Sequence, residues 1–147
     1  AFDALSEGLK RKLEGMRVMH SAKRSYGPQG AYADDDLKSM RIKVGEEGTK
    51  EQPHPCIRTH PETGRSILFV NWVYAIRFED MTEEESAPLL AFLVRHITQP
   101  AFQCRLRWEV GTLALWDNRI CVHQAFNDYD AFRREHYRTT VAGEIPR

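Results

Sequence analysis

The amino-acid sequence predicts a mainly β domain with supporting helices, of β-sandwich or jelly-roll architecture, and three observations predict it. Segment 104–110 alternates apolar and charged side chains, the pattern of a strand with one buried face. Three further segments, 112–116, 119–126 and 135–142, have strand composition and are separated by turn residues. Few helices interrupt these strands, so the balance favours a strand-dominated fold.

The first half of the chain contains one amphipathic helix and a long segment without periodicity. Apolar residues recur at helical spacing over 2–16 and predict a helix there. Residues 21–55 lose this periodicity and are rich in glycine, proline and charge, so we expect a mobile surface loop with a short helical piece near 35–40. Residues 59–64 then predict a turn, followed by a strand over 66–70.

A second helix is predicted over Thr82–Ile97. Thr82 and Glu85 have the spacing of a capping box, and leucines and a phenylalanine supply an apolar face. Pro88 is awkward in this helix because it lacks a backbone N–H. It predicts either a broken first turn or a later start capped by Ser86.

Length, charge and cysteine count exclude several classes of protein. The 147 residues are enough for one domain with a real core. Twenty-one basic residues balance 21 acidic ones, which argues against nucleic-acid binding. No apolar run approaches the ~20 residues of a membrane span. Cys56, Cys104 and Cys121 are odd in number and form no CxxC pair, which argues against a disulfide scaffold or zinc ribbon and favours a cytoplasmic location.

One histidine and two arginines near the C-terminus could form a binding site. His123 lies in the middle of a predicted strand, and Arg134 and Arg138 are four residues apart, so on a strand they share a face. A turn at 127–130 brings this second strand back beside the first. Two guanidiniums and an imidazole suit an anionic ligand beside a metal. The alternative is a solvated arginine pair and a hydrogen-bonded core histidine.

The same residues carry a resemblance to a known family. The C-terminal residues that carry it are Trp116, Asp117, Asn118, Arg119, His123, Asp128, Tyr129, Arg134, Arg138, Thr139 and Gly143. Upstream, segments 58–64, 69–71, 96–102 and 105–108 continue the match. This pattern resembles the C-terminal portion of the taurine dioxygenase (TauD/TfdA) family of Fe(II)- and 2-oxoglutarate-dependent dioxygenases, and it extends over essentially the whole chain.

The resemblance implies a fold and a set of site residues. The fold is a double-stranded β-helix, a jelly roll, of which residues 1–147 are one part. His123 matches the distal iron ligand, where a neutral imidazole suits a facial triad. Arg134 matches the arginine that pairs with 2-oxoglutarate, and Arg138 the one that holds the anionic head of the substrate. Tyr74 falls at an aromatic position of the substrate pocket.

The resemblance also implies a reaction and its partners. The expected enzyme uses Fe(II), O2 and 2-oxoglutarate, hydroxylates a small anionic substrate (a sulfonate, alkyl sulfate or aryloxyalkanoate), and releases succinate and CO2. Family members commonly form dimers or tetramers, so a homo-oligomer is expected, with no nucleic-acid or membrane partner. The alternative is a truncated or degenerate barrel without catalysis, serving as an anion-binding or oligomerisation module.

The family's other two iron ligands form a His-x-Asp motif, which this sequence lacks. His60 and Glu62 have similar spacing, but Pro61 argues against a central strand and the resemblance places them in a surface turn. We therefore expect this chain to be the C-terminal half of a longer protein that supplies the missing ligands. Cys121 and His123 could imitate a nucleophile and base, but no orienting carboxylate accompanies them.

Two smaller expectations complete the sequence-based picture. Trp116 and Asn118 are expected to shape the start of their strand rather than to contact ligand. His20, His54 and His96 show no ligand spacing with one another and are expected to be structural or exposed.

Overall fold

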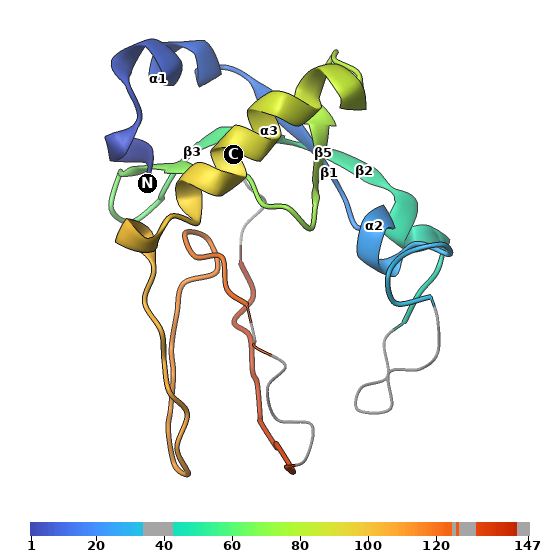
Figure 1. Ribbon diagram of the computed structural model, residues 1–147, viewed down its shortest axis with the longest axis vertical. Helices are drawn as coiled ribbons and strands as arrows, with labels where there is room; N and C mark the ends of the chain where they lie inside the picture. Colours follow the sequence, from blue (N-terminus) through green and yellow to red (C-terminus); the bar gives the residue numbers. More distant parts are fainter. Residues whose placement is uncertain (34–42, 125, 127–131, 144–147) are drawn as a thin grey trace.

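The structure, a computed structural model, describes residues 1–33, 43–124, 126 and 132–143. Its centre is an antiparallel three-stranded sheet in the order β2-β1-β5, and a separate two-stranded hairpin joins β3 to β4 (Figure 1). The strands are β1 (Arg17–Ser21), β2 (Glu51–Pro55), β3 (Ile57–Thr59), β4 (Ser66–Leu68) and β5 (Ala75–Phe78). Within the described residues neither sheet closes, so these sheets do not form a jelly-roll barrel.

The predicted N-terminal helix forms as two short pieces. A 3-10 turn, η1, spans Phe2–Ala4, and helix α1 spans Glu7–Leu13. Between them Ser6 has an extended backbone, and its side chain accepts a backbone N–H of α1 at 3.3 Å. The chain leaves α1 through Gly15, whose φ of 76° lies in the left-handed region that glycine adopts most easily. The single helix predicted over 2–16 is therefore wrong in its continuity, because Ser6 caps a new start.

Regular structure occurs within the segment predicted as a loop over 21–55. Helix α2 spans Lys23–Tyr26, the 3-10 turn η2 spans Glu46–Thr49, and β2 ends the segment. The prediction that this segment lacks regular structure is wrong for these parts, whereas its mobility stays a prediction. The expected helical piece at 35–40 lies outside the described residues.

The predicted turn over 59–64 is confirmed as the connection of the β3–β4 hairpin. The backbone N–H of His60 donates to the carbonyl of Arg65 at 2.8 Å, and Gly64 donates to the carbonyl of His60 at 2.9 Å. Gly64 has a φ of 69°, which lets the chain reverse here. The hairpin therefore holds His60 at a fixed point beside the end of β3.

The second predicted helix is confirmed as α3 (Glu83–Ile97), and its capping box is complete. The Thr82 hydroxyl accepts the N–H of Glu85 at 3.2 Å, and the Glu85 carboxylate accepts the N–H of Thr82 at 2.8 Å. Pro88 lies inside the helix without ending it. Ser86 is not the cap: its side chain is fully buried and accepts a backbone N–H of β5 at 2.9 Å.

Thr82→Ala is expected to lower the free energy of unfolding by about 1 kcal/mol, because it removes the hydroxyl that caps the first turn of α3. Urea denaturation of the purified protein measures this loss. Glu84→Gln, at an exposed position of the same turn, is the matched control and is expected to cost less than half as much. Equal losses in both variants would contradict the capping role.

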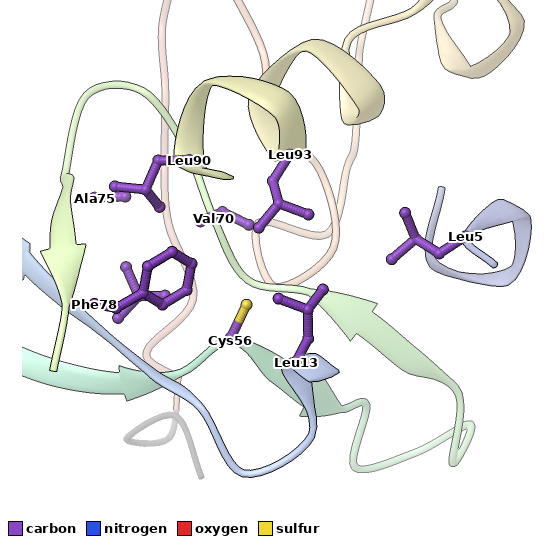
Figure 2. Close-up of a cluster of buried hydrophobic side chains, with 9 residues drawn as sticks. Leu5, Leu13, Cys56, Val70, Ala75, Phe78, Leu90 and Leu93 are labelled. Carbon is purple, nitrogen blue, oxygen red and sulfur yellow. The ribbon is translucent and has the colours of Figure 1, made fainter. Parts of the chain in front are cut away.

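The core lies between the sheet and the helices that cover it. In Figure 2, Leu90 points from α3 toward Phe78 of β5, and Leu93 points from the same helix toward Leu13 and Cys56. Leu13 and Leu93 are fully buried and Phe78 is 1% exposed. Burial raises the pKa of the Cys56 thiol to about 12, so this cysteine behaves as a small apolar core residue.

The four C-terminal strands predicted from alternation and composition are absent from the described residues. After the 3-10 turn η3 (Pro100–Phe102) the described residues run in two extended arms that project away from the sheet and α3 (Figure 1, orange to red). The first arm comprises residues 103–116, and the second comprises 121–124, 126 and 132–143. The strands predicted over 104–110, 112–116, 119–126 and 135–142 are therefore wrong in their described parts. No backbone ladder pairs these parts, and a strand needs such a partner to form.

Ring contacts nevertheless join the extended segments. The Arg105 guanidinium lies 5.1 Å from the ring centroid of Phe126, and the Trp108 and His136 rings are 4.8 Å apart. Large apolar side chains remain uncovered along both arms, including Val110, which is fully exposed. Apolar side chains exposed on such a scale indicate a surface that another segment covers.

No helix in the described parts of the chain is long and apolar enough to cross a lipid bilayer.

Candidate functional site

The structure places the predicted metal ligand, His123, in the second extended arm. Its side chain is exposed, and its ring lies 5.1 Å from the Trp116 ring, tilted by 56°. The Trp116 indole N–H donates to the Asn118 side chain at 2.8 Å. The strand whose start Trp116 and Asn118 were expected to shape is absent from the described residues, and that they do not contact ligand stays a prediction. The tryptophan also packs on the histidine, a contact that spacing alone did not predict.

The three other predicted site residues lie in two places. Arg134 and Arg138 are exposed and follow His123 in the second arm. Tyr74 lies far earlier in the chain, in the turn before β5, and is 39% exposed. Burial, and then the neighbouring Tyr26 and Tyr32, raise the pKa of Tyr74. Tyr74 thus belongs to a group of three tyrosines, whose Tyr26 and Tyr32 rings are 5.3 Å apart.

A metal site needs several donors, and the described residues supply only part of one. His123 has a suitable imidazole, but no group of three or more His, Cys, Asp or Glu side chains in the described ranges could hold a metal ion. The sequence also lacks the His-x-Asp pair. The chemistry of this chain therefore fits one ligand of an iron facial triad and not the complete site.

A cluster of four polar residues joins the β3–β4 hairpin to the chain just before His123. His60 is 5% exposed, and its Nε2 lies 3.1 Å from an Asp117 carboxylate oxygen. The Arg119 guanidinium donates to both Asp117 oxygens, at 2.6 to 3.0 Å, and to Glu62 at 2.9 Å. Arg119 first, and then His60, hold the pKa of the Asp117 carboxyl well below its usual range.

The structure bears on two alternatives raised by the sequence: that His60 and Glu62 bind a metal, and that Cys121 is a nucleophile. Both His60 ring nitrogens have partners, since Nδ1 accepts backbone N–H groups and Nε2 meets Asp117. Glu62 pairs with Arg119, so His60 and Glu62 are not positioned as metal ligands. Cys121 is a free, exposed cysteine, and its backbone N–H bonds the Asp117 carbonyl at 3.1 Å. Among the described residues, no hydrogen bond or ion pair activates Cys121 as a nucleophile for His123 to assist.

Two histidines that sequence reasoning treated separately meet in the structure. The rings of His20 on β1 and His54 on β2 are 4.9 Å apart, and both contact Phe69. His20 Nε2 and His54 Nδ1 are buried, and within the part of the chain that the structure describes neither has a hydrogen-bond partner. Burial, and then the neighbouring His54, lower the pKa of His20 to about 4. In the pairing of β1 with β2, His54 lies opposite Val18, two residues before His20, so the two histidines share a face of the sheet. Spacing along the chain could not predict this contact.

The stability of the protein is expected to fall as the pH is lowered from about 6.5 to about 4. Between these pH values the unfolded chain binds a proton at His20 whereas the folded chain does not, so protonation favours the unfolded state. The part of the folding free energy that the neutral, buried His20 retains above pH 6.5 is therefore lost across this range. The loss is roughly 3 kcal/mol at most. Urea denaturation at several pH values measures it. His20→Phe should flatten this pH dependence, whereas His136→Phe, at an exposed position, should leave it unchanged.

Comparison with known proteins places the chain in one family. The model of the family described as "Taurine catabolism dioxygenase TauD, TfdA family" matches residues 1–140. An alkylsulfatase of Acinetobacter baylyi is 32% identical over 146 residues, covering 99% of this chain and 45% of the relative. An alpha-ketoglutarate-dependent 2,4-dichlorophenoxyacetate dioxygenase of a Burkholderia strain is 35% identical over 145 residues, covering 97% of this chain and 46% of the relative.

A solved structure agrees with these relatives. The crystal structure of a taurine dioxygenase from Burkholderia xenovorans superposes with a TM-score of 0.54 at 29% identity, covering 74% of this chain and 30% of that protein. The chain thus spans less than half the length of the curated relatives it matches. Because the family match extends over residues 1–140, it includes the hairpin, α3, the first extended arm and the second arm as far as residue 140. The chain belongs to the TauD/TfdA family.

Proposed function

We propose that this chain is part of an Fe(II)- and 2-oxoglutarate-dependent dioxygenase that hydroxylates a small anionic substrate and releases succinate and CO2. The observation that carries the proposal is the family match over residues 1–140, a range that includes His123, Arg134 and Arg138. The names of the relatives describe catalysis, which disfavours a non-catalytic anion-binding module.

The proposed fold of the whole protein is a double-stranded β-helix to which residues 1–147 contribute one part. The extended arms support this proposal, because they have strand-like alternation, carry uncovered apolar side chains and lack a backbone partner within the described residues. Strands from the rest of the protein would supply both the missing ladder and the missing cover. The same region would supply a His-x-Asp pair for the metal.

In this proposal each site residue has a role that its chemistry suits. His123 holds iron through a neutral imidazole nitrogen. Arg134 binds the distal carboxylate of 2-oxoglutarate, for which a planar guanidinium offers two parallel donors. Arg138 holds the anionic group of the substrate. When bound, iron and 2-oxoglutarate supply the activation of O2, and the protein supplies ligand geometry, anion binding and a pocket that excludes water.

The proposed substrate class is a sulfonate, an alkyl sulfate or an aryloxyalkanoate. The relatives named above act, by their names, on an alkyl sulfate and an aryloxyacetate, and the solved structure is called a taurine dioxygenase. All three classes carry an anionic head group. Tyr74 would line the pocket with a polar aromatic wall, since Tyr26 and Tyr32 neighbour it.

Two measurements test the proposed function. First, the gene upstream of Ala1 should encode a His-x-Asp motif. Second, the full-length protein with Fe(II) and 2-oxoglutarate should release succinate in step with consumption of a compound from at least one of the three classes. A full-length gene without the motif, or a full-length protein that releases no succinate with any of these compounds, would contradict the proposal.

A further inference from the structure

The backbone of the β3–β4 hairpin determines which ring nitrogen of His60 carries the hydrogen. The side chain is almost fully buried, and its Nδ1 accepts the backbone N–H groups of Glu62 at 3.3 Å and Thr63 at 3.2 Å. A nitrogen that accepts carries no hydrogen, so the proton of the neutral ring lies on Nε2. His60 is therefore a donor that points away from its own turn.

The acceptor of this donor is Asp117, 57 residues later in the chain. Nε2 and the carboxylate oxygen are 3.1 Å apart. Asp117 organises its own turn, because its backbone carbonyl accepts the N–H groups of Ile120 at 3.2 Å and Cys121 at 3.1 Å. Its carboxylate also accepts the Arg119 backbone N–H at 2.8 Å. The β3–β4 hairpin thus fixes the turn at Asp117, from which the arm that contains His123 begins.

One of the two residues that flank Asp117, Trp116, contacts the predicted iron ligand. Trp116 and Asn118 are joined by an indole N–H bond of 2.8 Å, and the Trp116 ring packs against His123 with centroids 5.1 Å apart. A displacement of Asp117 would displace both of its neighbours. The contacts therefore run from His60 through Asp117 and Trp116 to the imidazole of His123.

We propose that His60 is a positioning residue for the metal ligand His123, acting through Asp117 and Trp116. This inference rests on the proposed function, because His123 has a metal to hold only if the protein is an iron enzyme. Metal ligands must lie within about 0.5 Å of their productive position, and the loss of a residue that orients a ligand typically costs 10- to 100-fold in metal affinity. In this proposal His60 acts through Asp117 and is assigned to neither substrate nor metal.

Two substitutions separate this positioning role from the role of His60 in its own turn. His60→Asn keeps an acceptor near the place of Nδ1, so it preserves the bonds from Glu62 and Thr63 and removes the donor to Asp117. His60→Gln keeps a donor near the place of Nε2 and removes the acceptor of the turn. The control is Thr63→Ala, which loses only the local bond from the Arg65 N–H to the Thr63 hydroxyl at 3.4 Å.

The measurements are Mn(II) affinity, followed by electron paramagnetic resonance, and thermal stability, both on the full-length protein. His60→Asn should weaken Mn(II) binding about tenfold. His60→Gln should stay within about threefold of the wild type, although it loses at least as much stability as His60→Asn. Thr63→Ala should bind Mn(II) like the wild type. Recovery of affinity in the Gln variant is a result that a purely structural role would not produce.

The outcomes distinguish this inference from the proposed function. A wild-type protein that binds Mn(II), together with an Asn variant that binds it equally well, would overturn the role of His60 alone. Equal losses of affinity in the Asn and Gln variants, in proportion to their lost stability, would do the same. A wild-type protein without Mn(II) affinity would overturn the dioxygenase proposal and the role of His60 with it.

Discussion

His123→Ala in the full-length protein is expected to abolish turnover of 2-oxoglutarate. The substitution removes an imidazole that we assign to the metal. It should leave the rest of the fold unaffected because His123 is exposed, and among the described residues its ring contact is with Trp116. Loss of residues that merely orient ligands costs 10- to 100-fold, so loss of a ligand should cost more than about 100-fold in metal affinity and in turnover. Succinate release and Mn(II) binding measure the two effects.

His96→Ala is the matched control for this prediction. His96 lies in the last turn of α3, bonds the Ala1 carbonyl at 2.9 Å and belongs to no proposed site. The control should keep wild-type turnover. Succinate release at the wild-type rate in His123→Ala would refute the assignment of His123 as a metal ligand.

Elements specified by local chemistry could be predicted from the sequence. The capping box of Thr82 and Glu85 marked the start of α3 correctly, and the turn over 59–64 followed from its glycine and proline content. Pro88 misled the prediction in part. The helix continues through it because Leu90 and Leu93 bury an apolar face against the core, and this packing offsets the lost backbone bond.

Strands were harder to predict, because a strand depends on its neighbour as much as on its own residues. The clear alternation over 104–110 forms no ladder in the structure, whereas β2, which contains Pro53 and Pro55, pairs with β1 at an edge of the sheet. Proline is tolerated at an edge strand, where one side needs no partner. Alternation thus predicted the tendency to form a strand and could not provide its pairing.

In the candidate site, too, features that depend on a local motif could be predicted, whereas contacts between distant parts of the chain could not. The identities of His123, Arg134 and Arg138 came from a motif within a short stretch of sequence. The bond between His60 and Asp117 joins residues 57 positions apart and is a product of tertiary structure. Both residues belong to runs that were recognised, but nothing in either run shows that the two meet.

Arg134→Ala in the full-length protein is expected to raise the apparent KM for 2-oxoglutarate by about 10- to 100-fold, with a smaller effect on kcat. The proposed pairing of Arg134 with the distal carboxylate is a charge-assisted hydrogen bond, and such bonds contribute about 1.5–3 kcal/mol to binding. Arg134→Lys keeps the charge but loses the two parallel donors, so its KM should lie between those of Ala and the wild type. Initial rates of succinate release at varied 2-oxoglutarate concentrations measure these values.

Two neighbouring arginines make this test specific. Arg133→Ala removes an adjacent guanidinium that pairs with Glu135, so it should leave the KM for 2-oxoglutarate unchanged. Arg138→Ala should raise the KM for the anionic substrate and not that for 2-oxoglutarate, because the two arginines are assigned to different anions. An unchanged KM for 2-oxoglutarate in Arg134→Ala, with an increase in Arg138→Ala, would exchange the two assignments. The protein would then be a dioxygenase that binds its cosubstrate through Arg138, four residues further along the arm.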